Sequence, residues 1–63
     1  MDKALDIIVN QIREKRGQVV TAVSNGVAKD FAEYRALCGE IKGLSLAEGY
    51  ILDLAHMMEQ SDE

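Results

Sequence analysis

Apolar residues recur every three or four positions along two segments of the chain, a spacing typical of one face of an α-helix. In the first segment they are Leu5, Ile8, Ile12, Val19, Ala22 and Val23, with Val9 widening the stripe. In the second they are Tyr34, Leu37, Ile41, Leu44, Ile51, Ala55 and Met58, with Glu48 as the polar interruption. The pattern predicts two helices, over residues 2–24 and 30–60.

A single cluster of turn-forming residues, Ser24-Asn25-Gly26, separates the two segments, and the chain contains no proline. Asn and Gly tolerate the left-handed backbone conformation that often ends a helix. Asp30, followed by Glu33, predicts an N-cap for the second helix. A turn over residues 25–29 is short enough to make the helices antiparallel neighbours. We therefore predict one all-α domain over residues 1–63, a coiled-coil-like two-helix hairpin.

The helix lengths also suggest a register. Both helices rise 1.5 Å per residue in opposite directions from the turn, so residues that lie opposite each other have numbers with a constant sum. We expect this sum to be about 55. In that register Lys15 and Arg16 lie near Glu40 and can form an ion pair with it. The last two turns of the second helix, with Leu54, Met57 and Met58, would then project beyond the first helix.

The second helix carries another apolar stripe, on the side away from its heptad seam. We call this stripe the second face; its residues are Ala32, Ala36, Gly39, Gly43, Leu46, Ala47, Tyr50, Leu54, Met57 and Met58. A helix that is apolar on two sides is normally buried on two sides. Because the first helix can cover one side only, we expect the second face to bind a partner. That partner is either a second copy, giving a bundle, or a larger protein.

Size and charge narrow the possible partners. The 63 residues carry eleven acidic and seven basic side chains, a net charge of −4. This balance argues against nucleic acid as the main partner, because binding there depends on neutralising phosphates. No apolar run approaches the roughly 18 residues of a membrane span, and Met1-Asp2-Lys3 does not resemble the start of a signal peptide. A domain this small usually needs disulfides, a metal or a partner chain for stability.

Candidate chemistry is sparse. A lone Cys38 cannot close an internal disulfide, and with a lone His56 it makes no zinc motif. A bundle di-iron site needs Glu-x-x-His pairs, which the sequence lacks. We expect no cofactor, no metal and no catalytic residue, and a two-helix hairpin offers no enclosed pocket for an enzyme. Arg13, Lys15 and Arg16 form a basic cluster whose role stays open between a solvated surface and an acidic or nucleic-acid contact.

Residues 26–44 read GVAKDFAEYRALCGEIKGL. This stretch resembles a group of small proteins of tailed bacteriophages, which share a GVAxDYAEYxxLCGEIxGL-like core after an amphipathic helix and are encoded among head and connector genes. Phe31 stands where that group has tyrosine. The resemblance extends from the first helix to about Ile51. It implies a phage structural or assembly protein, in the virion or the host cytoplasm, with no catalytic residues to carry over.

Three functions remain open at this point. The first is a structural or assembly protein that docks on itself or on a larger phage protein through the second face. The second is a small phage regulator that binds and inhibits a host protein through the same face. The third is a dimeric RNA-binding bundle that uses Arg13, Lys15 and Arg16.

Overall fold

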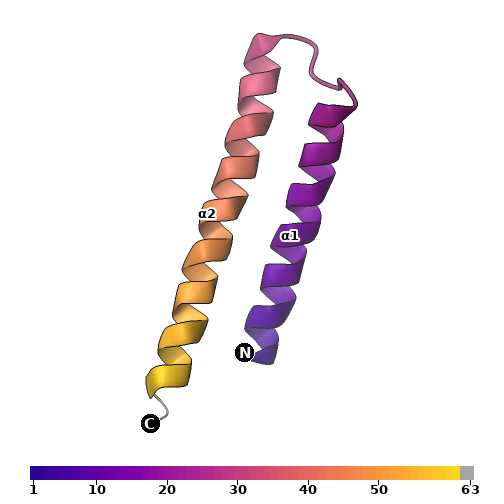
Figure 1. Cartoon of the computed structure of the whole chain (residues 1–63). Helices are drawn as coiled ribbons and strands as arrows, with labels where there is room; N and C mark the ends of the chain where they lie inside the picture. Colours follow the sequence, from indigo (N-terminus) through magenta and orange to yellow (C-terminus); the bar gives the residue numbers. More distant parts are fainter. Residues whose placement is uncertain (62–63) are drawn as a thin grey trace.

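The computed structural model describes residues 1–61 as two antiparallel α-helices lying side by side (Figure 1). Helix α1 spans Lys3–Ser24 and helix α2 spans Phe31–Ser61. The hairpin is a rod of 51 × 16 × 12 Å. The predicted all-α hairpin is confirmed, and the helix ends lie within one residue of the expected positions.

Each helix begins at an aspartate that accepts hydrogen bonds from its first turn. The Asp2 carboxylate accepts from the backbone N–H groups of Ala4 and Leu5, at 2.8 and 3.3 Å. The Asp30 carboxylate accepts from the N–H of Glu33 at 2.8 Å, as the sequence predicted. These bonds satisfy amide groups that a helix start leaves without partners, and the negative charge suits the positive end of the helix dipole.

Helix α1 ends in a Schellman motif. Gly26 adopts a φ of +70°, which costs an L-amino acid with a side chain far more than it costs glycine. The N–H of Gly26 donates to the carbonyl of Val23, and the N–H of Val27 donates to the carbonyl of Ala22, both at 3.1 Å. This is the paired pattern that closes a helix C-terminus. It explains why the chain leaves α1 at Gly26.

The contact between the helices is narrow. Val9, Val19 and Ala55 are the buried apolar residues of the described chain, and the rest of the seam is half-buried. On α1 the seam follows Leu5, Val9, Ile12, Arg16, Val19 and Val23. Val9 is 1% exposed whereas Ile8 is 43% exposed, so Ile8 lies outside the seam, contrary to the predicted stripe. Arg16 takes a seam position on α1, as Glu48 does on α2.

The register differs from the expected one. Arg13 contacts Glu48, Arg16 contacts Ser45, and the Met1 amino group lies 3.8 Å from the Glu59 carboxylate. The numbers in these pairs add up to 60 or 61, so α2 is displaced by about 9 Å towards the turn relative to the prediction. The expectation was wrong because the link of residues 25–30 rises past the end of α1 before α2 begins (Figure 1).

This displacement removes most of the predicted C-terminal overhang. Helix α2 extends past α1 at both ends (Figure 1), and Glu59 is already level with the N-terminus of the chain. Leu54, Met57 and Met58 therefore lie alongside α1 instead of beyond it. At the other end the first turn of α2 stands clear, and Phe31 is 70% exposed.

The Schellman motif yields a stability prediction. Replacing Gly26→Ala should lower the free energy of unfolding by about 1 kcal/mol, because alanine is disfavoured at positive φ. Gly17→Ala is the matched control, since a Cβ at Gly17 would meet no atom within 4 Å and Gly17 has ordinary helical geometry. That change should raise stability by up to about 1 kcal/mol. Urea unfolding followed by circular dichroism measures both; equal effects would contradict the assignment of the turn.

Candidate functional site

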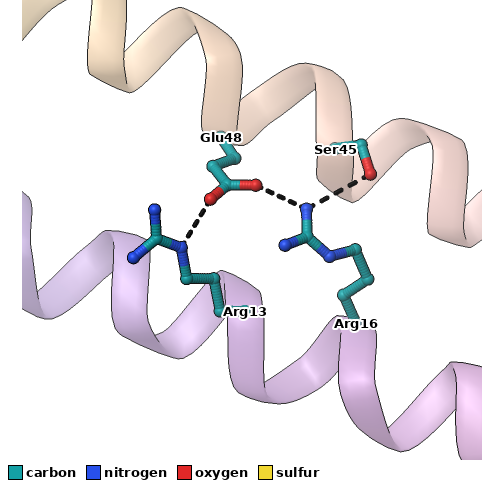
Figure 2. A network of polar contacts seen from close by, with 4 residues as sticks. All are labelled: Arg13, Arg16, Ser45 and Glu48. Carbon is teal, nitrogen blue, oxygen red and sulfur yellow. Dashed lines mark hydrogen bonds and ion pairs between the residues drawn. The ribbon is translucent and has the colours of Figure 1, made fainter.

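A polar network crosses the seam near the middle of the hairpin (Figure 2). The Glu48 carboxylate of α2 lies between two arginines of α1. One of its oxygens accepts from Nε of Arg13 and the other from Nη1 of Arg16. Arg16 also donates to the hydroxyl of Ser45 at 3.2 Å. The Glu48 side chain is 14% exposed and that of Arg16 is 26% exposed, so this ion pair is largely shielded from water.

The two guanidinium groups favour the charged form of Glu48. Hydrogen bonds from Arg13 and then Arg16 hold the pKa of its carboxyl below the ordinary value of 4.5. A paired charge within an otherwise apolar seam helps to specify register, because any slip of the helices leaves it without partners. The sequence had assigned Glu40 as the partner of Lys15 and Arg16. That assignment was wrong, because it rested on the register that the structure replaces.

The basic cluster is accordingly divided. Arg13 and Arg16 are turned to Glu48 within their own hairpin, while Lys15 is exposed. Phosphate binding by the arginines would compete with Glu48. The geometry therefore gives no support to an RNA-binding role for the three residues together.

The second face lies mostly at the surface of the hairpin. Its largest members are exposed: Tyr50 by 69%, Met57 by 60%, Leu46 by 50%, Leu54 by 46% and Met58 by 40%. Ala32, Ala36, Gly39 and Gly43 are exposed too, and Ala47 is half-buried at the edge of the seam. No position of this face carries a charge. A Cβ at Gly39 or Gly43 would meet no atom within 4 Å, so the hairpin itself does not require glycine there.

Helix α1 adds apolar residues to the flank of the rod on which the second face lies. At 100° per residue, Arg13 of α1 and Ser45 of α2 lie on one flank of the seam. At 100° per residue, Ala4 and Ile8 of α1 and Leu54 of α2 turn to the opposite flank. The sequence pattern had placed Ile8 in the seam and so missed its contribution to this surface. The exposure of Ile8 follows from the rotation of α1 about its axis, which the contacts of Arg13 and Arg16 with Glu48 define.

A second apolar feature, also missed from the sequence, stands at the turn end. The Phe31 and Tyr34 rings stack with centroids 6.2 Å apart, and the Arg35 guanidinium carbon lies 5.9 Å from the centre of the Phe31 ring. A hydrogen bond with Cys38 raises the pKa of Tyr34 above its ordinary value of 10.0. Phe31, Tyr34 and Arg35 are exposed because the link carries the start of α2 past α1, which periodicity does not reveal.

The remaining candidate residues have local surroundings. His56 is exposed, and its Nε2 lies 3.1 Å from Nε2 of Gln60. Cys38 is a half-buried free thiol. Within residues 1–61, no three side chains of the metal-binding types come together. In the same described part, neither helix combines the length and apolar character needed to cross a membrane.

Comparisons of the chain with protein-family models, with curated proteins and with solved structures found no match. The resemblance to small phage proteins therefore stays a prediction from residues 26–44. On the surface of the hairpin, the second face is the most extensive candidate site.

The shielded Glu48 leads to a pH prediction. Because its pKa is lowered by folding, its contribution to stability is present above the ordinary value of 4.5 and is lost as the pH falls through the lowered one. Glu48→Gln should therefore lower the melting temperature at pH 7, and the gap to the wild-type chain should shrink in acid. Thermal denaturation at a series of pH values checks this.

Glu40→Gln is the control for Glu48→Gln, since Glu40 is exposed and makes no ion pair within residues 1–61. It should change the melting temperature little at either pH. A loss at Glu40 as large as that at Glu48, or a Glu48 gap that does not depend on pH, would contradict the network.

Proposed function

We propose that this protein is a non-enzymatic structural or assembly protein of a tailed bacteriophage. It is a helical hairpin that docks through the second face of α2, on a copy of itself or on a larger phage protein. Its place is the virion or the host cytoplasm during assembly. The phage origin is supported by the resemblance in residues 26–44, and the mode of action by the surface of the hairpin.

The observation that carries the proposal is the imbalance between buried and exposed apolar side chains. Three apolar residues are buried in the described chain, whereas large ones such as Tyr50, Met57 and Leu46 are at least half exposed. Exposed apolar surface of this extent marks an interaction site on a small protein. Methionine and glycine suit such a site, since methionine adapts to irregular neighbours and glycine permits close backbone approach.

An enzymatic role has no support in this geometry. Among residues 1–61, the ionisable groups that meet across the hairpin are Glu48 with its two arginines and the N-terminal amino group of Met1 with Glu59, and both sets form ion pairs. No nucleophile lies among them. Binding is the activity that the exposed residues support.

The proposal is tested by looking for the protein in phage particles. A host would be infected with phage encoding a tagged chain, and purified virions and assembly intermediates would be analysed by mass spectrometry. The chain should appear in one of them in fixed ratio to a structural protein. Its absence from both, together with stoichiometric capture of one host protein, would favour the inhibitory regulator instead.

A matched pair of variants ties that result to the second face. Tyr50→Glu places a charge on this face and should reduce incorporation at least tenfold. Ile7→Glu is the control, because Ile7 is 51% exposed on α1 and does not belong to the second face. Equal incorporation of both variants, with helicity confirmed by circular dichroism, would show that docking occurs elsewhere.

A further inference from the structure

We infer that the occupant of the second face is a second copy of this chain, packed antiparallel about a two-fold axis close to Gly43. The inference rests on the proposed function, since it names the partner of that same face. Side-chain size along α2, the surface area of the rod and charges at the edge of the face support this pairing.

Side-chain size changes along the second face. Its N-terminal half, from Ala32 to Gly43, consists of alanine and glycine, and its C-terminal half, from Leu46 to Met58, is mostly large residues. A two-fold axis near Gly43 places the small half of one helix against the large half of the other. Ala36 then lies opposite Tyr50 of the second copy, and Ala32 opposite Leu54. A parallel pairing would instead set large residues against large ones and leave the small half unfilled.

The glycines fit this arrangement. Gly39 and Gly43 lie in open space in the single hairpin, where glycine is less favourable than alanine in a helix. Close to a two-fold axis they let the two α2 backbones approach each other. A symmetric contact of this type uses the same patch on both subunits, as most homodimers do.

The surface area matches what such a dimer needs. The chain exposes 4751 Å², whereas a compact monomer of 7.0 kDa is expected to expose about 4,000 Å². The excess of about 700 Å² is close to the roughly 800 Å² that each partner buries in a stable protein interface. The rod thus exposes more surface than a compact monomer of its mass, and an interface of ordinary size would cover an area similar to that excess. The result is a four-helix bundle, with Ala4 and Ile8 of α1 on the covered flank.

Charges at one edge of the face are complementary in this pairing. Arg35 and Asp53 are eighteen residues apart, which is five helical turns, so they share one edge of α2. An antiparallel two-fold close to Gly43 brings Arg35 of one copy within two residues, about 3 Å along the helix axis, of the level of Asp53 of the other, and the same pair forms again by symmetry. Within one hairpin Asp53 has no ion pair among the described residues.

Sedimentation equilibrium of the purified chain is the first test. The mass should be twice 7.0 kDa, and Gly39→Leu combined with Gly43→Leu should convert the dimer to monomer with helicity retained or raised. Gly17→Leu is the matched control, because it adds the same side chain in open space on α1 away from this flank, and it should remain a dimer. A monomeric wild-type chain, or a double variant that stays dimeric, would overturn the inference.

Disulfide trapping tests the direction of pairing. In a Cys38→Ser background, one protein carries Ala36→Cys and another carries Tyr50→Cys. Oxidation of the mixture should give the mixed disulfide, and each protein oxidised by itself should stay largely unlinked. Links within each single variant would indicate a parallel pairing, and the absence of any link would exclude contact at this level of the face. Both results overturn the inference.

The two proposals can fail separately. A chain that is monomeric yet present in phage particles at fixed ratio to another protein retains the proposed function and loses the dimer. A dimer that is absent from particles and assembly intermediates retains the pairing and loses the structural role.

Discussion

The hairpin depends on one carboxylate held between two guanidinium groups. Glu48 and Arg16 both occupy seam positions, so each would interrupt an otherwise apolar contact if the other were absent. Arg13 completes the site from the edge. Apolar side chains on two helices can slide past each other at little cost, whereas this network is satisfied at one offset. Together with the path of residues 25–30, it therefore determines which residues of α2 lie beside α1 and which remain outside.

The offset has a direct effect on the surface. It sets Leu54 and Met57 beside α1 and leaves Phe31 beyond it, the reverse of what helix length suggested. Leu54 of α2 then shares one flank of the rod with Ala4 and Ile8 of α1. The seam itself buries few residues, whereas the large residues of the second face are exposed. Another chain that covers this face would therefore add to a small core.

The two sides of α2 thus differ in what they require. The seam side needs α1 and includes charges that fix register, while the second face is uncharged and graded from small to large residues. The hairpin itself does not require glycine at positions 39 and 43, but glycine there would allow the backbone of a second helix to approach closely. This division accounts for the proposal that the protein acts by docking, and for the inference that its partner is a second copy of itself.

The sequence by itself determined the two helices, the Asp30 cap, the turn at Gly26 and the existence of two apolar stripes on α2, because these follow from local hydrogen bonding and from the angular period of a helix. It did not determine the offset between the helices, so Arg16 was assigned to Glu40 instead of Glu48. It also placed Ile8 in the seam together with Val9, whereas Ile8 is exposed. Periodicity fixes the direction in which a side chain points but not its height along the neighbouring helix. That height depends on the path of residues 25–30 and on the charge pairing across the seam, both of which exist only in the folded hairpin.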